Sequence, residues 1–365
     1  MNVLVVDAGS ASLHLRVVAD DGAVRAGRDL EDPGAQDTVR ALRELAAGDL
    51  GIDAVGHRIV HGGPGLSAPT LVDDEVRARL DQVAQLAPLH VPPALAALDE
   101  ARSVLADVPH IACFDTAFHT GLPEAASVYA LPAEWRERYG IRRYGFHGLS
   151  YAWTLARTAE LLGRPADRLQ VVLTHLGGGC SATAVREGRS VDTTMGFTPL
   201  EGLVMSRRSG TVDPGLLLWL ATEHGLSATE MTEVLNRRSG LTGLSGTSGD
   251  TRELVRSRAA GDAAAALALA VFTHRARSAI AAMAASLDRV DALVFTGEIG
   301  EDQPEVREEI CAGLGVLGIR GGLGSAGVLS EDTIVSAPGA AVAVLVVPTG
   351  EIQQIVIEVR SALRG

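Results

Sequence analysis

One pattern occurs twice along this chain, and it constrains the fold more than any other feature. An apolar run, Val3–Val6, leads into the turn Asp7–Ser10 and then into alternating apolar residues that begin at Leu13. About 170 residues later, Gln170–Leu173 leads into the glycine-rich turn His175–Ser181 and a second alternating segment. Each copy predicts a strand, a tight turn and a second strand. The repetition indicates a duplicated, two-lobed protein with a phosphate-sized ligand between its lobes, but two such hairpins can also match by chance.

The rest of the chain alternates between helical and strand-like patterns. Buried strands are predicted at residues 110–114, 291–295 and 340–347. Alternating strands and helices predict an α/β fold with mixed sheets, and 365 residues are enough for two domains. A helical period of apolar residues predicts helices at 38–47, 74–85, 92–105, 150–162, 216–224, 228–236, 262–287, 304–314 and 351–363.

Charge and residue usage exclude several kinds of chemistry. The formal net charge is −13, which argues against binding to nucleic acid or to an anionic membrane. All 32 basic residues are arginine. The chain therefore has no Schiff-base lysine, no lysine general base and no G-x-x-x-x-G-K-[ST] phosphate loop. Any positive charge in an active site must come from arginine, histidine or a metal.

The three cysteines indicate the redox state of the cellular compartment in which the protein works. Cys113, Cys180 and Cys311 are far apart, their number is odd, and no C-x-x-C pair occurs. This argues against a disulfide framework and favours a reducing cytoplasm. The chain opens on a strand-like run rather than a signal peptide, and its longest apolar stretch, around Ala263–Val271, is too short to span a membrane.

Three glycine-rich turns follow apolar runs, at Gly9-Ser10, Gly177–Gly179 and Gly297–Gly300. A backbone without Cβ atoms can bring its N–H groups close to phosphate oxygens. Each turn alone is weak evidence because such turns are common. Three of them together favour a phosphate ligand.

The segment Gly56–Gly63 combines histidine, arginine and glycine. On a strand, His57 and His61 would face one side, and Arg58 and Val60 the other. Because no third ligand has motif spacing, histidines that satisfy buried backbone groups are favoured over a zinc site. Arg58 and Val60 together could hold a small carboxylate, with the charged head on the guanidinium and the apolar tail on the valine.

Two arginine-rich loops and one aspartate complete the candidates. The loops 141–148 and 206–210 suggest an anion site in an otherwise acidic chain, with a solvated surface loop as the alternative. Asp115 follows a buried strand at its carboxyl end, where α/β proteins place working groups. A helix N-cap is the alternative role for Asp115.

Together these segments resemble the acetate/propionate kinase family, which belongs to the superfamily of sugar kinases, actin and Hsp70. The chain is shorter than is usual for that family, and the shortfall lies between Arg16 and Gly56. The motifs that carry the resemblance span nearly the whole chain: Val3–Arg16, Gly56–Gly63, Leu86–His90, Phe114–His119, Tyr139–Gly148, His175–Gly188, Ser190–Gly196, Thr198–Met205, Arg208–Gly210, Ser239–Gly243, Val294–Glu301, Pro304–Arg307 and Pro348–Glu351.

The resemblance implies both a fold and an activity. The fold would be a two-lobed, duplicated α/β fold, with residues 1–117 plus 350–365 in an N-terminal lobe on the acyl and Mg²⁺ side. Residues 118–349 would form a C-terminal lobe with the nucleotide side and a dimer interface. The activity would be reversible, Mg²⁺-dependent transfer of a phosphoryl group from ATP to acetate, giving acetyl phosphate and ADP. A cytoplasmic homodimer is expected, with a small carboxylate and a phosphoryl donor as ligands.

The resemblance also implies a role for individual residues. Arg58 and Arg208 would bind the carboxylate and the moving phosphoryl group. His147 would stabilise the transition state, with Asp115 as the essential acidic residue beside it. Arginine, histidine and Mg²⁺ suit a transition state whose charge spreads over three phosphoryl oxygens.

The remaining roles implied by the resemblance concern the methyl pocket, the metal and the donor. Val60, Leu89 and Pro199 would form the methyl pocket, and Asp7 and Glu351 would hold Mg²⁺. The donor would be bound by Ser10, Ser12, His14, His175, Gly177, Gly178, Gly179, Asp250, Thr251, Arg252, Glu298, Ile299, Gly300 and Glu301.

Departures from the family pattern cluster on the donor side. Glu298 replaces a small residue and adds bulk and negative charge where the nucleoside is expected. A desolvated carboxylate is costly there unless it reaches solvent or an arginine. The other departures are Asp7 for Asn, His14 for Lys, Gly178 for Asn, Thr251 for Met and Asp302 for Asn.

Three functions therefore stay open at the level of the sequence. The first is an ATP-dependent acetate kinase. The second is a related enzyme with another donor, such as pyrophosphate, or another acceptor, such as propionate. The third is an inactive, ligand-binding homologue. Val60 is bulkier than the alanine of propionate-preferring relatives, so we expect acetate to be preferred.

Overall fold

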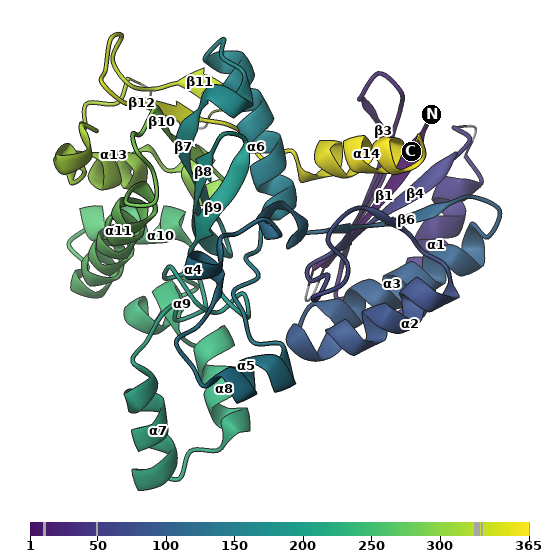
Figure 1. The fold of residues 1–365 in the computed structure, drawn as a ribbon, viewed down its shortest axis with the longest axis horizontal. Helices are drawn as coiled ribbons and strands as arrows, with labels where there is room; N and C mark the ends of the chain where they lie inside the picture. The colour runs from purple at the N-terminus through teal and green to yellow at the C-terminus, as the bar shows by residue number, and fades with distance from the viewer. Residues whose placement is uncertain (10–11, 49, 325–328, 330, 365) are drawn as a thin grey trace. The chain divides into compact units, whose positions relative to one another are not determined.

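The structure is a computed structural model that describes residues 1–365 except 10–11, 49, 325–328, 330 and 365 (Figure 1). The chain divides into two compact units. Unit 1 comprises Met1–Thr120, Phe146–Trp153 and Gly350–Gly365. Unit 2 comprises Gly121–Gly145 and Thr154–Thr349.

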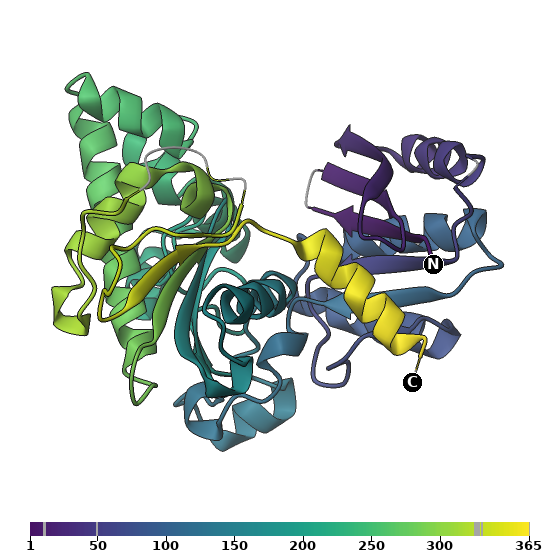
Figure 2. The same cartoon turned by 90° about the horizontal axis from the view of Figure 1, so that it is seen from above.

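Unit 1 is built on a six-stranded mixed sheet with the order β3-β2-β1-β4-β6-β5. Helices α1, α2 and α3 belong to one side of the sheet, whereas α14 packs on β1, β4 and β6 from the other side (Figures 1 and 2). The elements are β1 (Val3–Ala8), β2 (Ser12–Val18), β3 (Val24–Glu31), α1 (Ala35–Ala46), β4 (Ala54–Ile59), β5 (Thr70–Leu71), α2 (Asp74–Val83), α3 (Val91–Val104), β6 (His110–Phe114) and α14 (Glu351–Ala362).

Unit 2 is built on a second six-stranded mixed sheet with the order β11-β12-β10-β7-β8-β9. Its long helix α11 packs on β7 and β8. The elements are α4 (Glu124–Ser127), α5 (Ala133–Tyr139), α6 (Gly148–Leu161, which begins in unit 1), β7 (Gln170–Leu176), β8 (Cys180–Arg186), β9 (Arg189–Thr193), α7 (Pro214–Glu223), α8 (Ala228–Arg237), α9 (Gly240–Ser245), α10 (Thr251–Ala259), α11 (Ala263–Ala284), β10 (Ala292–Thr296), α12 (Glu298–Asp302), α13 (Pro304–Ala312), β11 (Thr333–Ile334) and β12 (Ala343–Val346).

The two sheets have the same topology. In unit 1, β1 pairs antiparallel with β2 and parallel with β4, and β6 continues the parallel set. In unit 2, β7 pairs in the same way with β8 and β10, and β12 continues the parallel set. The predicted duplicated α/β fold with mixed sheets is therefore confirmed.

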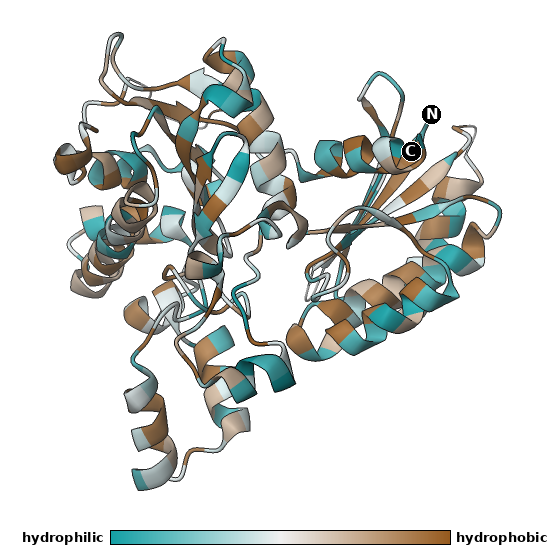
Figure 3. Cartoon of the chain, viewed as in Figure 1, coloured by the Kyte–Doolittle hydropathy of each residue, from teal (hydrophilic) through white to brown (hydrophobic). Residues whose placement is uncertain are grey.

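The burial of side chains explains which strands and helices could be predicted from the sequence. The central strands are almost wholly buried and appear hydrophobic in Figure 3, as do the helix faces that cover them. The strand predicted at 110–114 has those bounds in β6, and the helices predicted from 304 and 351 begin at those residues. None of the residues of strand β3 is buried. Its sequence therefore needs no alternation of apolar residues, and the pattern did not predict this strand.

One predicted strand face is wrong. Strand β4 ends at Ile59, so the alternation expected from His57 to His61 does not reach that far. The His57 ring instead stacks on His110, with 2.9 Å between His57 Nε2 and His110 Nδ1. His61 accepts a hydrogen bond from the Gly63 N–H and packs edge-on against Phe146. His61 therefore bonds a backbone N–H, as the non-metal interpretation expected, whereas His57 bonds the side chain of another histidine.

Candidate active site

Arg58 is the centre of a charged cluster in unit 1. It lies on β4, next to the buried Asp115 that follows β6, and its Nη2 donates to Asp115 Oδ2 at 2.8 Å. Its Nη1 lies 3.2 Å from Asp7 Oδ1 at the end of β1, and 3.7 Å from Glu351 Oε2 at the start of α14. The parallel strands β1, β4 and β6 end at one edge of the sheet, which is why these side chains meet.

The charges in this cluster do not balance. Three carboxylates surround one guanidinium, so the cluster has an excess of negative charge. Burial alone would lower the pKa of Arg58, but the carboxylates outweigh it and hold that pKa well above its usual value. Burial raises the pKa of Asp115, while Arg58 acts in the opposite direction. The arrangement keeps Arg58 charged and fixes its orientation through two-point contact with Asp115.

His147 is held beside Asp115 by the first turn of α6. The Gly148 N–H donates to the Asp115 carbonyl oxygen at 2.8 Å. A Cβ atom on Gly148 would lie 2.2 Å from that oxygen, so only glycine permits this approach. His147 itself has φ +60°, a left-handed conformation that is uncommon for residues other than glycine, and its ring is largely buried against Tyr151.

Two of the three expected methyl-pocket residues lie in unit 1. Val60, directly after β4, is 7 % exposed. Leu89 is half-buried in the turn before α3. The third residue, Pro199, lies in unit 2, where its carbonyl oxygen accepts from Arg208 Nη1 at 3.2 Å.

The first glycine-rich turn is described only in part. Ser10 lies outside the described residues. Ser12 begins β2, and its hydroxyl group is the nearest atom to a Cβ added at Gly9. His14 pairs in register with Asp7, but its ring contacts Asp29 of β3, with 2.7 Å between Nδ1 and Oδ1.

Half of the expected donor residues line one cavity of about 320 Å³ in unit 2. Gly177 and Gly178 enter it from the turn between β7 and β8, and Glu298 and Ile299 from the start of α12, the short helix after β10. Asp250, Thr251 and Arg252 enter from the start of α10. His175 lies on β7, Gly300 in α12 and Gly179 in the turn after β7, where the Gly177 N–H donates to the Gly179 carbonyl oxygen at 3.0 Å.

Glu298 is not desolvated in this cavity. Its side chain is exposed, and its charge helps to raise the pKa of Arg252, after the larger effect of Asp250. Arg252 also lines the cavity, with 2.8 Å between its Nη2 and Asp250 Oδ2. The carboxylate that departs from the family pattern therefore stays in solvent, which removes the expected desolvation cost.

Asp250 caps a helix in addition to its expected role in binding the donor. Its Oδ1 accepts the Arg252 N–H at 2.8 Å, which makes Asp250 the N-cap of α10. Hydrogen bonds from Arg252 lower the pKa of Asp250. The D-x-R spacing thus fixes the start of α10, and with it the wall of the cavity.

Arg208 lies in the predicted arginine-rich loop of unit 2 and is half-buried. Burial lowers its pKa, and its Nη1 contacts Met205 Sδ at 3.9 Å as well as the Pro199 carbonyl oxygen. Its neighbour Arg207 is exposed and lines the donor cavity with Ser206. The sequence placed Ser206 and Arg207 in a candidate anion loop but gave neither a role in binding the donor, and it did not indicate Gln303.

Comparison with known proteins decides the family. A model of the acetokinase family matches residues 34–357. This chain belongs to the acetokinase family. An acetate kinase of Deinococcus deserti is 47 % identical over 337 residues, which cover 90 % of this chain and 83 % of that protein. An acetate kinase of Leifsonia xyli is 50 % identical over 305 residues, which cover 82 % and 76 %. The crystal structure of an acetate kinase from Porphyromonas gingivalis aligns with a TM-score of 0.90 at 34 % identity, over 99 % of each chain.

The acetokinase family implies Mg²⁺, and the carboxylates of unit 1 fit that ion. Asp7 Oδ1 and Glu351 Oε2 converge on the same nitrogen of Arg58, so both carboxylates face one point. Mg²⁺ is usually held by one or two carboxylates together with substrate phosphates. Within the described ranges, no group of three or more His, Cys, Asp or Glu side chains that could hold a metal ion is found.

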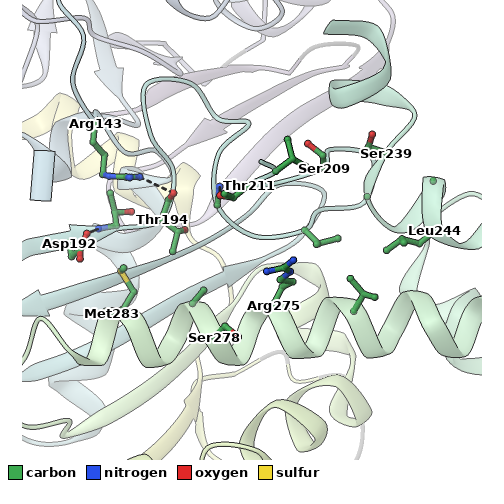
Figure 4. Close-up of a pocket in the computed structure, with 18 of the residues that line it drawn as sticks. Arg143, Asp192, Thr194, Ser209, Thr211, Ser239, Leu244, Arg275, Ser278 and Met283 are labelled. Atoms are coloured by element: carbon green, nitrogen blue, oxygen red, sulfur yellow. Dashed lines mark hydrogen bonds between the residues drawn. The ribbon is translucent and has the colours of Figure 1, made fainter. Parts of the chain in front are cut away.

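A further cavity of about 740 Å³ lies elsewhere in unit 2 (Figure 4). Arg275, Ser278 and Met283 project into it from α11, facing Thr211 and Ser209 on the opposite loops. It contains none of the expected site residues, although Ser209 is adjacent to Arg208 in the chain. Among the described helices, none is long and apolar enough to cross a membrane.

Proposed function

We propose that this chain is an acetate kinase that transfers the γ-phosphoryl group of ATP reversibly to acetate. The observation that carries the proposal is Arg58, oriented by Asp115 and flanked by Asp7 and Glu351, in a member of the acetokinase family. The donor cavity of unit 2, lined by Gly177 and the loop after β10, supports it. The exposed Glu298 is compatible with ATP as donor because its carboxylate keeps its contact with solvent at the cavity.

The chemistry requires little from acid–base groups. Acetate is already ionised near neutral pH, so no base is needed. One acetate oxygen attacks the γ-phosphorus and forms a P–O bond. The bond from that phosphorus to the β,γ-bridging oxygen breaks, and its electron pair leaves with ADP. Catalysis therefore depends on in-line positioning and on charge around the three phosphoryl oxygens.

The residues divide this work between them. Arg58 holds the acetate carboxylate in place, and Val60 and Leu89 of the same unit border its methyl group. Arg208 and His147 donate hydrogen bonds to the phosphoryl oxygens as charge develops on them. Mg²⁺, bound by Asp7 and Glu351, would neutralise phosphate charge.

The remaining donor residues would act mainly through the main chain. The N–H groups of Gly177–Gly179 suit the contact with phosphate, since no Cβ atoms block the approach. Ser10, Ser12 and His14 would contact phosphate from unit 1. His175, Asp250, Thr251, Arg252, Ile299, Gly300 and Glu301 would line or support the donor site.

We further propose a cytoplasmic homodimer that associates through unit 2, with the two units as an acyl and Mg²⁺ lobe and a donor lobe. Helix α7 supports an interface, because none of its ten residues is buried and it carries five consecutive apolar residues from Leu216 to Leu220. The free thiols of Cys113, Cys180 and Cys311 support a reducing compartment.

A hydroxylamine trap for acyl phosphate tests the activity. Purified protein, acetate and Mg²⁺ are incubated with ATP, with pyrophosphate or with no donor, and hydroxamate is measured. We expect hydroxamate with ATP and a loss of at least about 100-fold in Arg208→Ala. Product with pyrophosphate alone would replace ATP as the donor. No product with any donor, in either direction or with propionate, would overturn the proposal.

A further inference from the structure

The Glu301 side chain joins two distant segments of unit 2. Its Oε1 accepts hydrogen bonds from the Gly297 N–H and from the Thr349 N–H, both at 2.9 Å. These residues are 52 positions apart in the chain. Burial raises the pKa of Glu301, and the two N–H donors oppose that effect. One carboxylate oxygen therefore fixes the main chain at both positions.

The first segment is the loop that forms part of the donor cavity. Gly297 has φ +83°, and a Cβ atom there would lie 2.5 Å from the Leu176 carbonyl oxygen. The backbone at Gly297 is thus closely packed against Leu176, the last residue of β7. The cavity residues Gly177 and Gly178 follow Leu176 in the chain. Glu298 and Ile299, which follow Gly297, line the same cavity. A ligand in the cavity would therefore contact the segment that Glu301 holds.

The second segment is the point where the chain passes from one unit to the other. Thr349 is the last residue of unit 2, and Gly350 is the first residue of the closing segment of unit 1. A Cβ atom on Gly350 would lie 2.3 Å from the Trp153 ring, so this crossing is closely packed. Glu351 follows at once, opens α14, and lies 3.7 Å from Arg58.

These contacts form a continuous path along the chain. It runs from the donor loop through Glu301 to Thr349, and then through the backbone to Glu351 and Arg58. We propose that Glu301 is a positioning residue that couples occupancy of the donor cavity to the Arg58 site in unit 1. This inference rests on the proposed function, because it names the regulation of that same site. Glu301 itself touches neither the acyl group nor a reacting atom.

The coupling is measured in a complex that cannot react. ADP with Mg²⁺ and acetate bind together without chemistry, so calorimetry gives the Kd of ADP with and without saturating acetate. For the unmodified protein we expect each ligand to tighten the other by about 5-fold or more. For Glu301→Ala we expect that factor to fall to about 1. Glu301→Gln keeps an acceptor oxygen and is expected to retain most of the coupling.

A matched control is available in the same unit. Glu308 also accepts main-chain N–H groups, from Gly322 and Leu323, but neither segment borders the donor cavity or a crossing between units. Glu308→Ala is expected to keep the coupling factor of the unmodified protein. If Glu301→Ala does not fold, Glu301→Asp serves instead, because its shorter side chain cannot reach both N–H groups.

Several outcomes would overturn the inference. One is a coupling factor near 1 in the unmodified protein. Another is a coupling factor in Glu301→Ala equal to that of the unmodified protein, even with weaker ADP binding. Equal loss in Glu308→Ala would also overturn it. These results are distinguishable from failure of the proposed function, which would appear as absence of hydroxamate from the unmodified protein.

Discussion

At the residue scale, Glu358 is an acid placed among hydrophobic side chains. It lies on α14 between the core residues Val356 and Val359. Its Oε1 accepts from Gln354 Nε2 at 3.2 Å, while its buried Oε2 has no hydrogen-bond partner among the residues that the structure describes. Burial raises its pKa to about 7. Between about pH 4.5 and pH 7, Glu358 is therefore protonated in the folded protein and ionised in the unfolded chain.

This predicts a stability that falls as the pH rises. Between the unfolded pKa near 4.5 and the folded pKa near 7, the folded state binds more protons, so its stability decreases with increasing pH. The loss reaches about 3 kcal/mol above pH 7. Glu358→Gln should therefore raise the unfolding midpoint at pH 8.5 and change it little at pH 5. Thermal melts at both values check this, with the exposed Glu75→Gln as control. An equal shift at both pH values would contradict the prediction.

Val60 gives a second prediction at this scale. Its side chain is 7 % exposed and lies directly after the strand that carries Arg58. Shortening it in Val60→Ala should make room for one more methylene group on the acid. Because one methylene group is worth roughly 1–3 kcal/mol in a specific pocket, we expect the kcat/KM ratio of propionate to acetate to rise about tenfold.

The control for this change is another buried valine in unit 1. Val72 is 6 % exposed, and Val72→Ala creates a similar cavity away from Arg58. It should lower stability and leave the propionate-to-acetate ratio unchanged. A ratio that rises equally in both variants would argue that Val60 does not border the acyl group.

At the scale of elements, the start of α6 positions His147. The Gly148 N–H bonds to the Asp115 carbonyl oxygen, and an added Cβ would meet that oxygen at 2.2 Å. Gly148→Ala must therefore move α6 or the end of β6. We expect a loss of about 1–3 kcal/mol in stability and a fall of about 100-fold in kcat, because His147 is displaced. Steady-state kinetics and urea unfolding measure the two effects.

A glycine without such neighbours serves as the comparison. No atom lies within 4 Å of a Cβ added at Gly121, and its φ lies outside the left-handed region. Gly121→Ala should keep both kcat and stability. If Gly148→Ala also retained full kcat, the first turn of α6 would not position a catalytic group.

At the scale of the whole molecule, α7 predicts association. Leu218 and Trp219 are 68 % and 51 % exposed, and Figure 3 shows hydrophobic residues along this helix. Leu218→Glu should convert a dimer into a monomer, because a charge in an apolar contact is costly to desolvate. Sedimentation velocity measures the change. Val316→Glu, at another exposed apolar residue, should leave the dimer intact. An unmodified protein that sediments as a monomer would contradict the proposed homodimer.

The sequence by itself determined the features that depend on local order. Periodicity predicted the helix starts at Pro304 and Glu351 and the strand His110–Phe114, and the repeated hairpins predicted two sheets of one topology. The absence of lysine determined that arginine, histidine or a metal must supply the positive charge. Each of these follows from residues that are near one another in the chain, where spacing alone carries the information.

The tertiary structure decided the relations between distant residues. It joined Arg58 to carboxylates from the ends of β1, β6 and the start of α14, and it joined Glu301 to Thr349. It also left Glu298 exposed, which the chemistry of the side chain could not indicate. Such contacts depend on strand order and helix packing, because a charge acquires its partners and its solvent only when the chain has folded.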